Sequence, residues 1–198
     1  ATDVNNAVKR MLSQTEQMQA LLGDLLELSR LQSDDTHGTE EVVNVPAMLM
    51  QLKEQAEELS RGKHKLRFKV DPAICLTGVS ADLESAFSNL IRNAIKYTPK
   101  RGTVRVTWKD REAGPRLEVR DTGIGSPHRD IPRLTERFFR VGADRARQTG
   151  GTGLGLAIVK HVVNAHQARL VIESELGAGS EFTIVFPADR RAGGQDGL

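Results

Sequence analysis

Two glycine-rich turns, with an arginine-rich segment between them, form the stretch of the chain best suited to phosphate chemistry. The first turn is Asp121–Gly125 and the second is 150–156, which opens into an apolar helical segment. Glycine lets backbone N–H groups approach a ligand closely, a helix N-terminus favours anions, and guanidinium groups match phosphate oxygens. We therefore expect a nucleotide pocket with a mobile lid, and the arginines between the turns are Arg129, Arg133, Arg137, Arg140, Arg145 and Arg147.

A helix predicted over 80–97 carries the polar side chains that such a pocket needs. At about 100° per residue, four polar residues gather on one face and the apolar residues on another; the four are Asn89, Asn93, Lys96 and Tyr97. Asparagine oxygens are hard, neutral ligands suited to Mg²⁺, a lysine is a point charge for phosphate oxygens, and a tyrosine ring can flank a base or ribose. A merely solvated face is the alternative, but asparagine is a poor helix former without such a purpose.

Two better-known phosphate-binding patterns do not fit the second turn. A dinucleotide fold needs a buried strand directly before its glycines, whereas the polar segment 145–149 precedes Gly151. A Walker-type phosphate loop needs lysine and then serine or threonine after its glycine, a run that the chain does not contain. A different nucleotide fold is therefore expected.

The composition indicates a soluble domain and excludes several classes of protein. The chain has 198 residues, 38% of them hydrophobic and 27% charged, and its net charge of +2 gives no support for nucleic-acid binding. Its single cysteine, Cys75, rules out an internal disulfide framework. No apolar run approaches the roughly 20 residues needed to span a bilayer. Because the sequence opens in mid-helix without an initiator Met, we expect a fragment of a longer protein.

The N-terminal segment predicts a long amphipathic helix of the coiled-coil or bundle type. Its seam repeats at alternating spacings of three and four residues and consists of Val8, Met11, Thr15, Met18, Leu22, Leu25 and Ser29. One helix cannot bury such a face alone, so it needs partner helices, most simply from a second copy of the chain. Docking of the seam onto the following domain is the alternative.

The remaining sequence predicts one α/β domain. Helices are expected from Pro46 to about Arg61, over 80–97 and after the second turn, and strands over 66–70, 104–108, 117–119, 170–172 and 182–186. Strands joined by hairpins favour a mixed, largely antiparallel sheet with helices on one face, which is a two-layer α/β sandwich. We divide the chain into a dimerisation helix (1–33), a linker (34–44), the α/β domain (45–187) and a disordered tail (188–198).

Four segments together resemble the characteristic boxes of sensor histidine kinases. Segment 89–98 resembles the N box, 121–125 the G1 box, 137–141 the F box and 151–156 the G2 box, in the family's order and spacing. The match extends over about residues 8–187. Within the family, the phosphate-regulon sensors are most similar to this sequence at 131–141, 145–151 and 160–164.

The resemblance implies a Bergerat or GHKL-type ATP-binding fold. Asn93 would coordinate Mg²⁺ with support from Asn89, and Asp121 would accept a hydrogen bond from the adenine amino group, a role suited to an ionised carboxylate. Phosphoryl transfer depends mainly on positioning and charge, and the implied catalytic residues are Asn93, Lys96 and Arg140. The implied ATP-binding residues are Asn89, Asn93, Lys96, Tyr97, Asp121, Gly123, Gly125, Arg140, Arg147, Gly151, Thr152, Gly153, Leu154, Gly155 and Leu156.

The sequence departs from the family pattern at two places. Ser126 follows the first turn where the family usually has an apolar residue, which puts the anchoring of the lid in question. The family's phosphoacceptor histidine lies on the first bundle helix and precedes an acidic residue, but no histidine here occurs before His37 and none precedes an acidic residue. The helix at 8–31 therefore resembles the second bundle helix only.

The resemblance thus implies the ATP-binding catalytic domain of a two-component sensor kinase. It would transfer the γ-phosphoryl group of ATP to a histidine outside this fragment, for onward transfer to a response regulator in phosphate-limitation signalling. The parent protein would be a homodimeric inner-membrane sensor, with this part in the cytoplasm. A catalytically silent dimerisation and binding module with a degenerate pocket is the alternative, although Asn93, Lys96, Asp121 and the glycines are all present. A gyrase- or chaperone-like ATPase is disfavoured by the bundle helix directly upstream.

Overall fold

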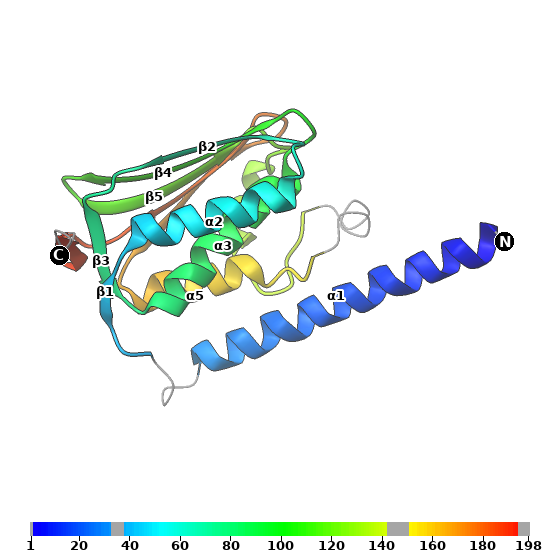
Figure 1. Cartoon of the computed structure of the whole chain (residues 1–198), viewed down its shortest axis with the longest axis horizontal. Helices are drawn as coiled ribbons and strands as arrows, with labels where there is room; N and C mark the ends of the chain where they lie inside the picture. The colour runs from blue at the N-terminus through cyan, green and yellow to red at the C-terminus, as the bar shows by residue number, and fades with distance from the viewer. Residues whose placement is uncertain (1, 33–37, 142–150, 194–198) are drawn as a thin grey trace.

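The computed structural model describes residues 2–32, 38–141 and 151–193. An N-terminal helix, α1 (Thr2–Gln32), precedes a domain that contains both helices and strands (Figure 1). The α-helices of the domain are α2 (Val45–Ser60), α3 (Ser80–Tyr97) and α5 (Gly155–Ala165). Its described 3-10 helices are η2 (His128–Arg133) and η3 (Ala188–Arg190). The strands are β1 (Glu41–Val43), β2 (Lys65–Val70), β3 (Ile74–Gly78), β4 (Thr103–Arg111), β5 (Gly114–Asp121), β6 (Arg169–Glu175), β7 (Gly179–Val185) and β8 (Arg191–Gly193).

The main sheet and three helices form two layers. The sheet has five strands in the order β2-β4-β5-β7-β6, in which β2 and β4 are parallel and the other neighbours antiparallel. Helices α2, α3 and α5 cover one face of this sheet (Figure 1). The parallel pair arises because α3 lies in the connection from β2 to β4 and returns the chain in the same direction. The predicted two-layer α/β sandwich with a mixed, mostly antiparallel sheet is confirmed.

Apolar stripes on the helices face the sheet and form the core. On α3, Leu83, Phe87 and Leu90 have no exposed surface, as the helical periodicity predicts. The ring centroid of Phe87 lies 6.3 Å from that of Trp108 on β4. The Trp108 indole N–H donates a 2.9 Å hydrogen bond to the carbonyl of Ile74, so this large core side chain leaves no unpaired donor. The buried stripe fixes the rotation of α3 about its axis, and thereby the direction of its asparagine-bearing face.

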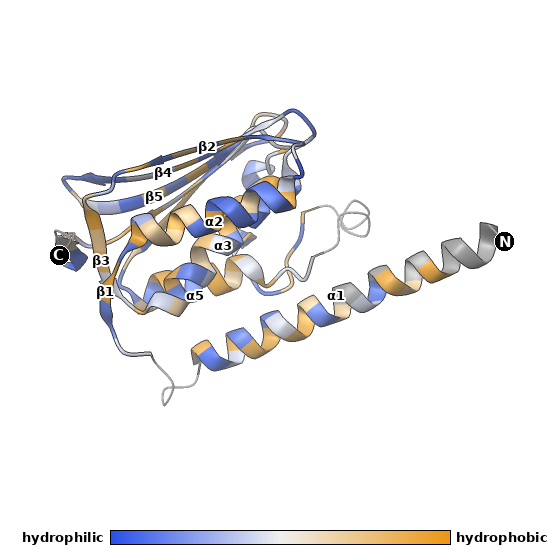
Figure 2. Cartoon of the chain, in the orientation of Figure 1, coloured by the Kyte–Doolittle hydropathy of each residue, from blue (hydrophilic) through white to orange (hydrophobic). Residues whose placement is uncertain are grey.

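A second sheet, of three strands in the order β1-β3-β8, lies at one end of the domain (Figure 1). Strand β3 is strongly apolar (Figure 2) and buries Cys75 between two other buried residues. Strands β1 and β8 pair with β3 from either side. Residues 41–43 of the predicted linker 34–44 thus form a strand, and residues 188–193 of the tail predicted to be disordered (188–198) form η3 and β8, which corrects the prediction for that part of the tail. Residues 41–43 and 191–193 are held by backbone pairing with β3 rather than by apolar patterns of their own; residues 194–198 lie outside the described part of the chain.

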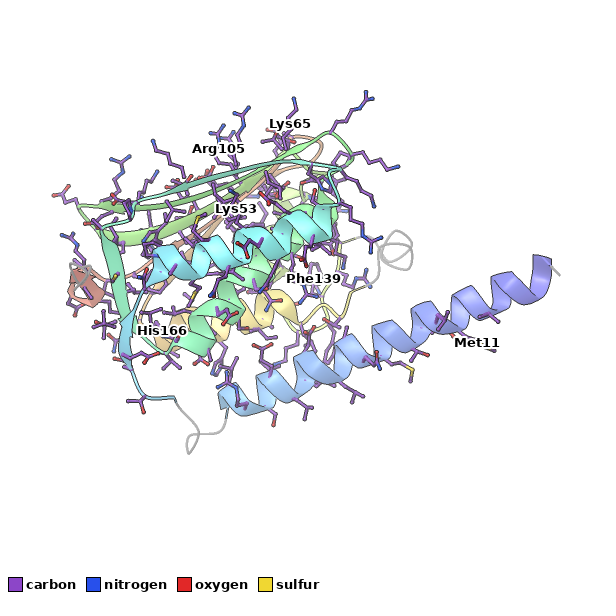
Figure 3. All side chains as sticks on the ribbon, in the orientation of Figure 1. Met11, Lys53, Lys65, Arg105, Phe139 and His166 are labelled. Carbon is purple, nitrogen blue, oxygen red and sulfur yellow. The ribbon has the colours of Figure 1, made fainter. Side chains whose placement is uncertain are left out.

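Helix α1 has two faces with different surroundings. Along the predicted seam, Met11, Met18 and Leu22 expose 66%, 67% and 60% of their surface, and Met11 lies where the helix extends beyond the domain (Figure 3). Leu28 and Leu31, near the C-terminal end, are instead 5% and 3% exposed. The seam therefore does not dock on this domain, but an adjacent face does. Among the described residues, no helix is both long enough and apolar enough to cross a membrane.

His166 joins the end of α5 to the start of α3 (Figure 3). The side chain is 1% exposed; Nδ1 donates to the carbonyl of Val162 at 2.8 Å, and Nε2 accepts from the N–H of Val79 at 3.0 Å. Only the neutral ring can do both, because a protonated Nε2 could no longer accept. Burial accordingly lowers the pKa of His166 from its ordinary value of 6.5. His166 is therefore a structural residue that needs to be uncharged.

Replacement of His166 by alanine is expected to reduce the free energy of unfolding by about 2 kcal/mol, because the buried N–H of Val79 loses its acceptor. A folded-state pKa below 6.5 means that the unfolded chain binds the proton more tightly. The stabilisation by His166 is therefore complete above that pH and is lost as the pH falls below it. Urea unfolding of the parent and of His166→Ala from about pH 8 to about pH 5 tests this. Identical pH profiles for the two proteins would contradict it.

Candidate functional site

The polar face of α3 lies beside the start of α5. Its four side chains are all partly buried, and they are Asn89, Asn93, Lys96 and Tyr97. The side-chain amide of Asn89 donates to the carbonyl of Ser85 at 3.1 Å. Its Oδ1 atom points towards Gly155, where an added Cβ atom would lie 2.6 Å from that oxygen. Glycine at the first position of α5 therefore leaves room for the Asn89 side chain to keep this position.

The second glycine turn is held by contacts with two distant segments of the chain, one at Phe138 and the other on α1. Gly153 has a φ of +74°, a conformation suited to glycine, and its carbonyl accepts from the N–H of Phe138 at 3.0 Å. The Thr152 hydroxyl oxygen accepts from the N–H of Leu154 at 3.2 Å, and the hydroxyl donates to the carboxylate of Asp24 on α1. Leu154 is completely buried. The turn is thus anchored in the core immediately before α5 begins.

Lys96 and Arg140 converge on the second turn at Gly151. The Nη1 atom of Arg140 donates to the carbonyl of Gly151 at 2.9 Å, and a Cβ atom on Gly151 would collide with Nζ of Lys96. Burial, together with the positive charges of Arg140 and Arg92, lowers the pKa of Lys96 to about 8, while the negative charge of Asp24 acts in the opposite direction. Two cations thus lie close together in a partly buried place, which favours the binding of a phosphate group.

Asp121 lies where β5 ends, beside the C-terminal end of α3. The residue is 5% exposed, and its Oδ1 atom accepts from the N–H of Gly123 at 2.7 Å. Burial raises the pKa of Asp121 from its ordinary value of 3.8, while backbone hydrogen bonds from Gly123 and Ser180 act in the opposite direction. A buried carboxylate held by backbone N–H groups is an acceptor suited to a neutral donor such as an amino group.

The first glycine turn packs between α3 and the β6–β7 hairpin. The N–H of Ile124 donates to the carbonyl of Tyr97 at 3.1 Å, and the Ile124 carbonyl accepts from the N–H of Gly177 at 2.8 Å. Gly125 has a φ of +62°, and a Cβ atom there would collide with the carbonyl of Glu175. The turn therefore requires glycine at this position for both conformation and space.

Ser126, which departs from the family pattern, is anchored through its backbone. Its N–H donates to Oγ of Ser174 at 2.8 Å. That hydroxyl is itself held in the β6–β7 hairpin, 2.9 Å from Oγ of Ser180. The chain after the first turn is thus fastened by a contact that does not depend on an apolar side chain at 126.

The structure brings most of the predicted residues into one region, although they come from separate parts of the chain. The polar face of α3, Arg140 and the second turn meet at one place, and the first turn with Asp121 packs on the end of the same helix. Arg147 and Gly150 lie outside the described residues, as does the part of the predicted lid at 142–149. Leu156 is partly buried and packs against the core.

Asp24 was not predicted as a site residue. It belongs to a second stripe on α1, formed by Leu21, Asp24, Leu28 and Leu31 at spacings of three and four residues. This stripe lies one residue before the seam at Leu22, Leu25 and Ser29. The three- and four-residue spacing of this stripe is visible in the sequence, but the seam is longer and gives the stronger helical periodicity.

Comparison with known protein families identifies the fold. Residues 78–190 match the family model described as "Histidine kinase-, DNA gyrase B-, and HSP90-like ATPase". The chain belongs to this ATPase family. The matched region contains α3, both glycine turns and α5, which are the elements that build the site. The predicted GHKL-type fold is confirmed.

The relatives of this ATPase domain include bacterial sensor kinases. The chain is 49% identical over 189 residues to the phosphate regulon sensor protein PhoR of Pseudomonas aeruginosa, and the alignment covers 93% of this chain and 43% of that protein. It is 36% identical over 181 residues to PhoR of Haemophilus influenzae, covering 91% and 42%. The chain thus spans less than half the length of these curated relatives. The predicted similarity to phosphate-regulon sensors is confirmed.

Solved structures give the same family. The mycobacterial sensor histidine kinase MprB superposes with a TM-score of 0.66 at 30% identity, over 75% of this chain and 97% of that one. Full-length ShkA in complex with AMPPNP superposes with a TM-score of 0.76 at 27% identity, over 92% of this chain and 38% of that one. The chain is therefore an ATP-binding catalytic domain of the sensor histidine kinase type, as the four boxes predicted.

Alanine at Gly125 and at Gly177 should have different effects on stability. Both residues have positive φ, +62° and +85°, but only Gly125 is enclosed; nothing lies within 4 Å of a Cβ atom at Gly177. We expect Gly177→Ala to cost about 1 kcal/mol for left-handed strain. Gly125→Ala should cost about 2–4 kcal/mol, because the carbonyl of Glu175 must also move. Urea unfolding of both variants measures the difference, and equal losses would refute the proposed enclosure of the first turn.

Proposed function

We propose that this domain holds Mg-ATP between α3, the two glycine turns and the N-terminus of α5. The observation that carries the proposal is the convergence of Lys96 and Arg140 on the backbone of Gly151, in a site whose buried carboxylate is Asp121. Cations suit the phosphates, and the carboxylate suits the amino group of adenine. A nucleoside triphosphate matches this distribution of charge.

The second turn is proposed to bind phosphates through its backbone. Helix α5 begins at Gly155, and no side chain caps its N-terminus. The first N–H groups of a helix have no partner within the helix and favour an anion. Gly151, Thr152, Gly153 and Gly155 would therefore place backbone donors along the triphosphate, while Tyr97 flanks the base or ribose.

Asn93 is proposed as the protein ligand of Mg²⁺, with Asn89 supporting it. Both side chains lie on the face of α3 that carries Lys96, and both offer neutral amide oxygens. In the described residues, no group of three or more His, Cys, Asp or Glu side chains could hold a metal ion by itself. This donor set fits Mg²⁺, which keeps water and phosphate oxygens as ligands. When bound, the ion would neutralise part of the phosphate charge.

The reaction is proposed to be transfer of the γ-phosphoryl group to a histidine outside the given sequence. Lys96 and Arg140 would orient the phosphates and stabilise the charge that develops on the transferred group. Asp121 would fix the position of the base, so that the terminal phosphate reaches the same place in each encounter. No side chain of this domain needs to form a covalent bond.

The wider role follows from the relatives and is likewise proposed. Similarity to PhoR supports phosphate-limitation signalling, with onward transfer to the receiver domain of a response regulator. The exposed seam of α1 supports a homodimer in the full-length protein, because such a face needs partner helices. The domain would then work on the cytoplasmic side of a membrane-anchored sensor. A catalytically silent binding module is the competing function.

Asp121→Asn is expected to weaken ATP binding about tenfold or more, because a hydrogen bond to a charged acceptor typically contributes about 1.5–3 kcal/mol. Asparagine can still accept from Gly123, so the turn should remain folded. Asp71→Asn removes the same charge at an exposed position and serves as the control. Calorimetric titration measures both variants; Asp121→Asn binding ATP as tightly as the parent would rule out the assigned adenine contact.

Asn93→Ala is expected to abolish the gain in ATP affinity that Mg²⁺ produces in the parent, while binding without the ion changes little. Asn164→Ala, an exposed asparagine on α5, is the control. Each protein is titrated with ATP in the presence and absence of Mg²⁺. The same proteins are then mixed with a separate bundle domain that carries an acceptor histidine. Labelled phosphate on that domain, lost in Asn93→Ala, supports a kinase; none with the parent supports the silent module.

A further inference from the structure

Asp24 connects helix α1 directly to the second glycine turn. The hydroxyl of Thr152 donates to its carboxylate, joining residues 128 positions apart, and both side chains are partly buried. Thr152 directly follows Gly151, whose carbonyl holds Arg140. The carboxylate therefore lies beside the cationic part of the site rather than on an unrelated surface.

The position of Asp24 is set by the docking of α1. Leu28 and Leu31 are 5% and 3% exposed, and Leu21 packs against the same core. Between these two leucines, Arg30 forms a 2.6 Å ion pair with Asp82 of α3, and the side chain of Asp82 is 4% exposed. Asp24 lies on this stripe, so the apolar contacts and the ion pair hold its carboxylate against the turn.

The negative charge of Asp24 acts on Lys96. It raises the pKa of Lys96 and so opposes the effects of burial and of Arg140 and Arg92. The carboxylate thus places a negative charge beside Lys96. A triphosphate bound there would meet an anion that is already in place.

We infer that Asp24 is a determinant of nucleotide affinity and specificity: while α1 is docked, its carboxylate competes with the terminal phosphates for the Lys96–Arg140 side of the site. The inference rests on the proposed function. The loss of binding affinity caused by Asp24 should grow with the number of phosphates, so that the affinity for ATP is reduced most, that for ADP less and that for adenosine not at all. Because coupling between two binding events is reciprocal, ATP should weaken the docking of α1 by the same factor.

A purely structural role for the Asp24–Thr152 contact leads to a different result. If the hydrogen bond only stabilised the turn, its loss would lower stability and leave nucleotide binding unchanged or weaker. Competition instead requires tighter ATP binding when the carboxylate is removed. The sign of the change in affinity therefore distinguishes the two roles.

The test is calorimetric titration of the whole chain with ATP, ADP and adenosine, each with Mg²⁺. For Asp24→Asn we expect ATP affinity to increase about fivefold or more, at the lower end of typical coupling, with a smaller increase for ADP and none for adenosine. Glu27→Gln removes one carboxylate from the same helix without the Thr152 contact and should have little effect. An unchanged or reduced ATP affinity in Asp24→Asn would overturn the inference.

Arg30→Gln provides a second arm that does not touch the site. The substitution removes the cation that pairs with the buried carboxylate of Asp82. Release of α1 from the domain is then favoured, because it lets water reach the Asp82 carboxylate. ATP affinity should therefore rise, although the substitution removes a positive charge; a fall would count against competition by the docked helix. If the parent and all variants fail to bind ATP, the proposed function itself is wrong. If they bind ATP equally, only the role of Asp24 is wrong.

Discussion

Two positive side chains, Lys96 and Arg140, meet at the backbone of one glycine, and this juxtaposition of like charges is the constraint on which the rest of the site depends. Both must be held in place, because free side chains would separate to reduce their repulsion. Lys96 is held because the opposite stripe of α3 is locked into the core by Leu83, Phe87 and Leu90. Arg140 is held by its hydrogen bond to Gly151. The packing energy of the core thus maintains an arrangement that an anion would relieve.

The two glycine turns give the site two chemically different ends, one at Asp121 and the other at Lys96 and Arg140. The first turn, fixed between α3 and the β6–β7 hairpin, keeps Asp121 buried and bound by backbone donors. The second turn places Gly151 against Lys96 and starts α5 without a side-chain cap. One end therefore suits a neutral donor and the other suits phosphates, which agrees with membership of a family of ATPases. Glycine is needed at both turns because neighbouring backbone or side-chain atoms occupy the space of a Cβ atom.

Helix α1 precedes the ATPase domain and contacts it through one of its two faces. Its seam is exposed and available to partner helices, whereas its second stripe, which includes Asp24, docks beside the nucleotide site. The two faces overlap near the C-terminal end of the helix, where Leu25 is 39% exposed and Leu28 is buried. A change in how partner helices pack on the seam would therefore alter the docked stripe. This geometry offers a direct physical route from the seam of α1 to the site.

The amino-acid sequence by itself determined the local features: the polar face of α3, the two glycine turns, the alternating strands and the mixed sheet. These depend on spacing within short segments, where helical and strand periodicities are decisive. Only the tertiary structure decided the β1-β3-β8 sheet, the order of residues 188–193 and the contact between Asp24 and Thr152. Segments such as 41–43 and 191–193 carry no pattern of their own, and become ordered because the edges of β3 offer them backbone partners. The docking of α1 likewise joins distant parts of the chain, up to 128 residues apart; the spacing of its second stripe indicates a second face, but not the surface on which that face docks.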